Sequence, residues 1–181
     1  MNLPNKITLI RIFLLPLIVV LLISPSKLSS FFAVIIFVLA SFTDWLDGHI
    51  ARSTGQITNL GKVLDPIADK LLIVAALIPI VALGRAPAWI VVILICREFA
   101  VSGLRIIAMS QRLTIPASTI GKYKMFAQII AIILLILNYH ILFIDFFILG
   151  TIALWIALIL SLISGVDYFI KFCYQTDLYM E

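Results

Sequence analysis

The segment from residue 44 to residue 69, DWLDGHIARSTGQITNLGKVLDPIAD, decides the fold of this chain, because it places four aspartates where two apolar stretches meet. The chain has only nine acidic residues among 181, and nearly half of them lie here. Carboxylates beside a bilayer are energetically expensive, so they usually mark function. Their spacing is Asp44-x-x-Asp47-Gly48-x-x-Ala51-Arg52, then eight residues, then Gly61-x-x-x-Asp65-x-x-x-Asp69.

The rest of the composition predicts an integral membrane protein. Apolar residues make up 64% of the chain and the mean hydropathy is +1.22, whereas a soluble domain is about 45–50% apolar. A helix needs about 20 residues to cross a bilayer, and six stretches qualify: 6–23, 31–50, 59–83, 88–109, 120–138 and 146–170. We therefore expect an all-α fold of six transmembrane helices that forms a single membrane domain over residues 1–181.

The basic residues predict the orientation of those helices. If the helices alternate in direction, ten basic residues share one side of the membrane, while Lys27 and Arg85 lie on the other and Arg97 lies deep in the fourth helix. The positive-inside rule then places both termini and the aspartate segment in the cytoplasm. The polar tail after Asp167 is expected to end in the membrane interface, where Tyr168, Tyr174 and Tyr179 suit an aromatic belt.

Helical geometry predicts that the aspartates form one ligand set. Asp44 and Asp47 are three residues apart and Asp65 and Asp69 four apart, so each pair shares a helix face. Two pairs on adjacent helices can bracket two cations, and ligand sets made only of oxygen favour Mg²⁺ or Mn²⁺ over zinc. One carboxylate could instead act as a general base. Taken singly, each aspartate also fits an ordinary acid at a helix end.

Pro66 predicts either a kink at Asp65 or a helix that becomes regular only there, because proline removes a backbone donor and restricts the residue before it. Gly48 lets a phosphate approach closely, and Arg52 is a planar donor for phosphate oxygens.

All eight fixed positions of this segment resemble the signature of the CDP-alcohol phosphotransferase family. Further agreement comes from the Asn5-x-x-Thr8-x-x-Arg11 segment, from Arg97-Glu98 and from Ser102-Gly103-Leu104-Arg105, so the likeness spans roughly residues 3–125. These segments are most similar to the bacterial members that use glycerol 3-phosphate. The segment Gly121-Lys122-Tyr123-Lys124 is also similar, but Met125 follows it where the family pattern has a threonine.

The resemblance implies a homodimeric, six-helix enzyme of the bacterial cell membrane that takes part in phospholipid synthesis. Such an enzyme transfers the phosphatidyl group of CDP-diacylglycerol to sn-glycerol 3-phosphate and releases CMP, using two Mg²⁺ or Mn²⁺ ions in each active site. Membrane lipids are further partners, and no nucleic-acid partner is expected.

The resemblance also assigns roles to single residues. It makes Asp44, Asp47 and Asp65 metal ligands, and it makes Asp69 both the general base and a further metal contact. The CDP-lipid site it implies is formed by Asn5, Thr8, Gly48, Ala51, Arg52 and Gly61.

A second group of residues predicts an acceptor pocket. Arg97, Arg105 and Arg112 are eight and seven residues apart, so they lie on one helix face. Lys122 and Lys124 begin the next helix on the same side of the membrane. Together these cations could hold the phosphate of glycerol 3-phosphate through charge-assisted hydrogen bonds. Arg112, Lys122 and Lys124 also fit a simpler interpretation, in which they contact lipid headgroups.

Three alternatives remain open on the sequence. The same chemistry could serve another acceptor: serine, inositol phosphate or phosphatidylglycerol. A cation transporter could use the aspartates as its ion site, but transporters place such groups near the midplane of two related halves, and no repeat occurs here. A lipid-binding scaffold without catalytic activity would not need Asp69.

Overall fold

The computed structural model describes the backbone of residues 3–23, 26–54, 59–111, 119–141 and 144–180, and the side chains of residues 8–23, 26–43, 66–111, 119–139 and 145–176. In this part of the chain the helices are α1 (Leu3–Ile23), α2 (Lys27–Thr54), α3 (Asn59–Ala82), α4 (Ala88–Ser110), α5 (Thr119–Leu137) and α6 (Phe146–Met180). Between α5 and α6, β1 (His140–Ile141) pairs antiparallel with β2 (Ile144–Asp145).

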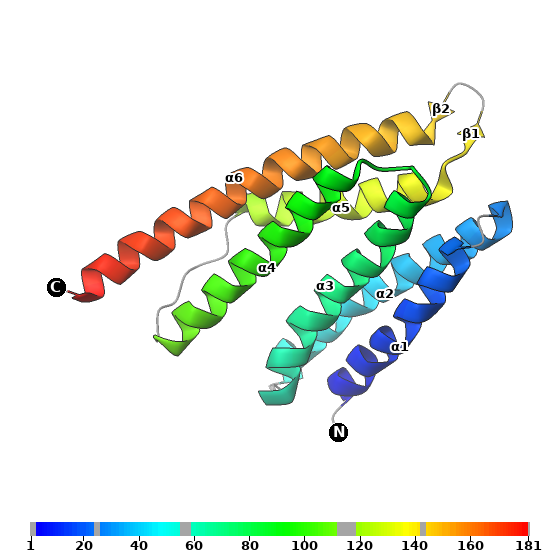
Figure 1. Cartoon of the computed structure of the whole chain (residues 1–181). Coiled ribbons are helices and arrows are strands. Elements are labelled where there is room, and N and C mark those ends of the chain that lie inside the picture. The colour runs from blue at the N-terminus through cyan, green and yellow to red at the C-terminus, as the bar shows by residue number, and fades with distance from the viewer. Residues whose placement is uncertain (1–2, 24–25, 55–58, 112–118, 142–143, 181) are drawn as a thin grey trace.

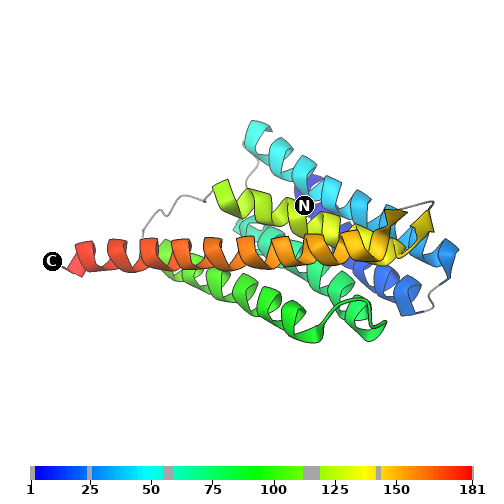
Figure 2. The same cartoon turned by 90° about the horizontal axis from the view of Figure 1, so that it is seen from above.

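The helices form two groups that share one core (Figures 1 and 2). In the first group α1 packs against both α2 and α3. In the second, α6 packs along α5 and against α4, and its C-terminal end extends past the other helices. Contacts of α5 with α2 and of α3 with α4 and α5 join the groups. The aspartate helices α2 and α3 therefore lie beside the helices that carry the predicted acceptor pocket.

The all-α class is confirmed, apart from the short strand pair. Each predicted stretch falls on one helix, but α6 continues to Met180, beyond the predicted end at residue 170. The helix α3 begins at Asn59 and contains Pro66, so the interpretation that it becomes helical only at Asp65 is wrong. Among the described residues, the helices long and apolar enough to cross a membrane are Thr119–Leu137 and Phe146–Thr176.

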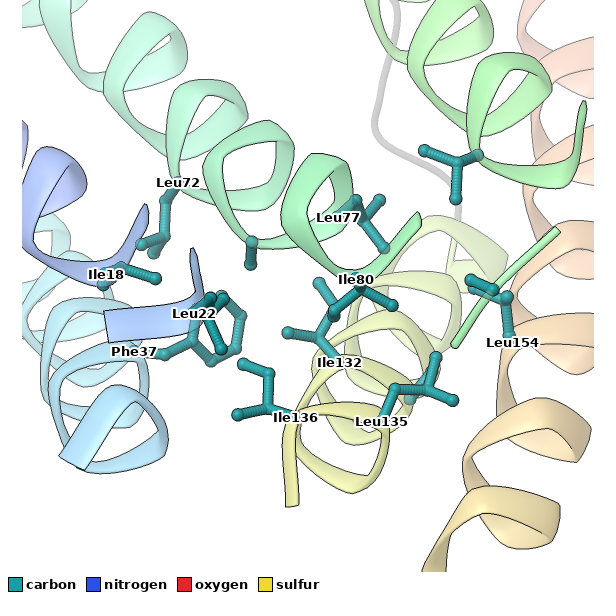
Figure 3. Close-up of a cluster of buried hydrophobic side chains, with 14 of the residues drawn as sticks. Ile18, Leu22, Phe37, Leu72, Leu77, Ile80, Ile132, Leu135, Ile136 and Leu154 are labelled. Atoms are coloured by element: carbon teal, nitrogen blue, oxygen red, sulfur yellow. The ribbon is translucent and has the colours of Figure 1, made fainter. Parts of the chain in front are cut away.

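Aliphatic side chains from most of the helices fill the core (Figure 3). Ile18 and Leu22 of α1 meet Phe37 of α2 in the first group, all of them at most 1% exposed. Leu135 and Leu154, both 0% exposed, occupy the second. Large apolar side chains also cover the outside, where they suit a lipid environment better than water: Phe13, Phe42, Trp89, Ile106, Phe126, Ile156 and Phe169 are among them.

One end of the bundle is held by helix caps. Gly84 has a φ of +68° and its N–H donates to the carbonyl of Val81 at 2.9 Å, while the N–H of Arg85 donates to that of Ile80 at 3.0 Å, which is a Schellman ending for α3. The Arg85 guanidinium donates to the carbonyls of Ile136 at 2.8 Å and Leu135 at 3.3 Å, so it caps the last turn of α5. Partial burial lowers the pKa of Arg85 from its usual value, yet arginine stays charged at neutral pH.

The beginnings of α2 and α6 lie at the same end. Ser26 and Ser29 exchange backbone-to-hydroxyl hydrogen bonds of 2.9 and 3.0 Å at the start of α2. Asp145 Oδ1 accepts from the N–H of Phe147 at 2.9 Å and so caps α6. The Tyr139 hydroxyl donates to the carbonyl of Lys27. Lys27 and Arg85 therefore share one end of the bundle, as alternating helices require, and the aspartates lie along α2 and α3 away from it.

Arg85→Met should lower the free energy of unfolding by about 1–2 kcal/mol, because it removes a charged hydrogen-bond donor from the end of a helix. Thermal unfolding of the purified protein in detergent would measure the change. Lys27→Ala is the matched control, since it removes an exposed cation at the same end. Equal effects of the two substitutions would contradict the capping role.

Candidate active site

The four aspartates occupy two neighbouring helices. Asp44 and Asp47 belong to α2, and Asp65 and Asp69 to α3, so the helical spacing that places each pair on one face applies to both. The side chains of Asp44, Asp47 and Asp65 lie outside the described residues. For five predicted CDP-lipid contacts, too, only the backbone is described: Asn5, Gly48, Ala51, Arg52 and Gly61. Arg112 lies outside them altogether.

Asp69 is the one member of the set whose side chain the structure describes. It is half-buried on α3, between the fully buried Ala68 and a half-buried Lys70. The Lys70 ammonium donates to the carbonyl of Pro66 at 2.8 Å. Asp69 also lies within electrostatic reach of Lys70 and of Lys124 on α5. A carboxylate of α3 thus lies within electrostatic reach of Lys124, one of the cations predicted to bind the acceptor.

Two predicted polar residues of α1 are fully enclosed. Thr8 is 0% exposed and Arg11 is 1% exposed, which makes Arg11 the largest fully buried side chain of the described part. Burying a guanidinium is costly unless other groups solvate it. Because α1 packs against α2 and α3, these two polar side chains lie within the same helix group as the aspartates.

The acceptor-side cations form a network across three helices. Arg97 of α4 donates from Nη2 to Ser164 Oγ of α6 at 2.7 Å, and its Nη1 lies 3.5 Å from Glu98 Oε1. Lys124 of α5 pairs with the same Glu98 oxygen. We call these four residues, Arg97, Glu98, Lys124 and Ser164, the α4–α6 network.

The aliphatic part of Arg97 lies against the backbone of α6. A Cβ added to Gly165 would meet Arg97 Nε at 3.1 Å and Cγ at 3.3 Å, so the absent side chain makes room for the arginine. Arg97 is therefore held by three kinds of contact: a hydroxyl, a carboxylate and a backbone surface.

The other predicted cations differ in setting. The Arg105 guanidinium lies over the Tyr168 ring, 5.9 Å from its centroid, at a distance typical of a cation–π contact. Arg105 also lies within electrostatic reach of Lys70 and Arg97. Lys122 is exposed, whereas Lys124 is only 7% exposed. Lys124 therefore lies within electrostatic reach of both Asp69 and Arg97, and Arg97 within reach of Arg105. Lys122 lies at the surface.

Two sequence interpretations are corrected here. Tyr168 is only 5% exposed and its ring faces the Arg105 guanidinium, so it is not part of an interfacial aromatic belt. The headgroup interpretation of Lys124 is also wrong, since this lysine is buried and paired with Glu98.

The polar residues that α6 places in this region were not predicted, although their spacing in the sequence indicates them. Ser161, Ser164 and Tyr168 are three and four residues apart, so they form a narrow polar face on an otherwise apolar helix. All three are at most 5% exposed. The role of Glu98 could not be predicted either, because a contact with Lys124, 26 residues away, cannot be read from spacing.

The donor set suits hard divalent cations. Four carboxylates on adjacent helices offer only oxygen ligands, which Mg²⁺ and Mn²⁺ prefer. Within the described side chains no group of three His, Cys, Asp or Glu residues gathers, and three of the four aspartates lie outside that part. That the four aspartates suit divalent cations therefore follows from their places on α2 and α3 and from the chemistry of carboxylates.

Comparison with known proteins gives consistent matches over most of the chain. The family model described as CDP-alcohol phosphatidyltransferase matches residues 1–163. A CDP-diacylglycerol–glycerol-3-phosphate 3-phosphatidyltransferase of Bacillus subtilis (strain 168) is 42% identical over 182 residues, 94% of each chain. An enzyme of the same name from Rickettsia bellii is 39% identical over 93% of each chain. A probable phosphatidylglycerophosphate synthase of Mycobacterium tuberculosis is 39% identical, over 92% of this chain and 79% of its own.

Gly165→Ala should lower the free energy of unfolding by about 1 kcal/mol, because the new methyl group pushes Arg97 away from α6. Gly103→Ala, also in a helix, is the matched control: nothing lies within 4 Å of its added Cβ, so alanine should be neutral or stabilise the helix. Urea unfolding of both variants would measure the difference. A Gly165→Ala variant as stable as Gly103→Ala would contradict the close packing of Arg97.

Proposed function

The chain belongs to the CDP-alcohol phosphatidyltransferase family, and we propose that it transfers the phosphatidyl group of CDP-diacylglycerol to sn-glycerol 3-phosphate, giving phosphatidylglycerophosphate and CMP. The observation that carries this choice of acceptor is the cluster of cations Arg97, Arg105 and Lys124, of which Lys124 lies within electrostatic reach of Asp69. Relatives at 34–42% identity bear the name of that activity. A neutral acceptor such as serine would need fewer cations.

The setting we propose is a bacterial cell membrane crossed by all six helices. The outward-facing apolar side chains support this arrangement, as does the excess of basic residues at the aspartate end. The active site and both termini then face the cytoplasm, where CDP and glycerol 3-phosphate are soluble. The acyl chains of the substrate remain among lipid, and a homodimer is the expected assembly.

The CDP end of the lipid would lie over α1, α2 and α3. Arg52 donates to phosphate oxygens, and Gly48, Ala51 and Gly61 leave room beside the aspartates. Asn5 and Thr8 complete the nucleotide side. Thr8 is fully buried in the helix group that carries the aspartates.

Asp44, Asp47, Asp65 and Asp69 would hold two Mg²⁺ or Mn²⁺ ions, which supply charge neutralisation for the diphosphate and for the leaving CMP. Four carboxylates carried by two adjacent helices would repel one another, so a set of this kind is suited to binding cations.

Asp69 is the proposed general base. It takes the proton from the 1-hydroxyl of glycerol 3-phosphate, whose oxygen attacks the phosphorus that bears diacylglycerol, and the bond to CMP breaks. Arg97, Arg105 and Lys124 meanwhile hold the acceptor phosphate by charge-assisted hydrogen bonds, and Lys122 and Arg112 are the further basic residues proposed for the same phosphate. Catalysis comes mainly from positioning and charge neutralisation, as in phosphoryl transfer generally.

Purified protein with CDP-diacylglycerol and Mg²⁺ or Mn²⁺ should release CMP when glycerol 3-phosphate is added. Serine, inositol phosphate and phosphatidylglycerol, each tested alone, should support much less release. Chromatography would measure the CMP released with each acceptor, and mass spectrometry would identify the lipid product. Equal or faster release with another acceptor would overturn the choice of substrate while leaving the transfer chemistry in place.

Asp69→Asn should reduce kcat by about 10²–10⁴-fold, the usual contribution of general acid–base catalysis. Binding of CDP-diacylglycerol should persist, because the asparagine occupies the same volume. Equilibrium binding of labelled CDP-lipid alongside turnover would separate the two effects. Asp167→Asn removes an acid paired with exposed Lys171 and serves as the control. A fully active Asp69→Asn enzyme would refute the assignment.

A further inference from the structure

The α4–α6 network contains an acid that the proposed chemistry does not use. Glu98 lies on α4 beside Arg97, and a single one of its oxygens, Oε1, faces both Arg97 Nη1 and Lys124 Nζ. Its side chain is 21% exposed, whereas those of Arg97 and Lys124 are 13% and 8% exposed. It is thus a carboxylate shared by two partly buried cations from two helices.

Two buried cations side by side are unfavourable unless an anion lies between them. Arg97 and Lys124 repel each other, and Arg105 adds to the positive charge around Arg97. An ammonium as enclosed as Lys124 is costly to keep charged without a partner. Glu98 supplies that partner, and by bonding to Lys124 it also links α4 to α5.

Arg97 is fixed from its other side by α6. The 2.7 Å bond to Ser164 and the close approach to Gly165 leave its guanidinium little freedom. Ser164 itself donates to the carbonyl of Ser161 at 3.2 Å, so the hydroxyl that receives Arg97 is oriented by its own helix. Both α6 residues lie beyond residue 163, where the family match ends.

From these contacts we propose that Glu98 is a positioning residue for the acceptor site, which holds Arg97 and Lys124 in place and charged, without touching substrate. Ser164 supports Arg97 in the same way from α6. This inference rests on the proposed function, because the two cations matter only if they bind the phosphate of the acceptor.

Glu98→Gln should raise the KM for glycerol 3-phosphate about tenfold or more, the effect expected when a charged hydrogen bond is lost, while the KM for CDP-diacylglycerol changes less than about twofold. Glu98→Asp keeps the charge on a shorter side chain, so its KM should lie between those of Glu98→Gln and the unchanged protein. Ser164→Ala should raise the same KM by a smaller factor. Steady-state kinetics with each substrate varied in turn would measure these values.

The controls separate the possible outcomes. Asp167→Asn, which breaks an exposed ion pair on α6, should leave both KM values unchanged, and thermal unfolding shows whether each variant is folded. If Glu98→Gln does not fold, the Glu98→Asp and Ser164→Ala values decide the question. An unchanged KM for glycerol 3-phosphate in the Glu98→Gln variant would overturn the inference. A lower KM would also overturn it, because Glu98 would then be competing with the acceptor for the cations. Failure of the unchanged protein to use glycerol 3-phosphate would instead count against the proposed function.

Discussion

The structure depends on one constraint: charge placed inside an apolar helix bundle must be compensated by a neighbour. The chain has thirteen basic and nine acidic residues among 181, so charges are few and each charged residue within a helix has consequences. Lys124 pairs with Glu98, Arg97 bonds to Ser164, and Arg85 caps the carbonyls of α5. The same constraint explains why four neighbouring aspartates suit bound cations, since their own charges would otherwise repel.

The two ends of the bundle meet this constraint in different ways. At the Lys27 and Arg85 end, turns and caps pair the polar groups with backbone atoms: Asp145 receives the N–H groups of α6, and Tyr139 bonds to the carbonyl of Lys27. Toward the aspartates, charged side chains meet one another across helices instead. Hydrogen bonds to backbone atoms fix the polar side chains at the Lys27 and Arg85 end. Side-chain networks leave charges that a substrate with phosphate groups can engage.

Much of this arrangement could be predicted from the sequence, because it follows from local patterns. Apolar runs predicted the helices, and the stretch 59–83 predicted the end of α3 to within one residue. The spacing of Asp65 and Asp69 gave their shared face without any tertiary information. The extension of α6 was missed because its last turns are polar, so hydropathy alone ended the helix at residue 170.

The contacts that were missed depend on helix packing rather than on spacing. Nothing local distinguishes Lys124, which is buried, from Lys122, which is exposed, because both begin the same helix. Their difference arises from the side of α5 that packs against α6 and meets Glu98 of α4. The contact of Tyr168 with Arg105 likewise joins two helices that are distant in the sequence. Sequence patterns therefore identify which residues can carry phosphate chemistry, while packing decides which of the cations is held rigidly and which remains at the surface.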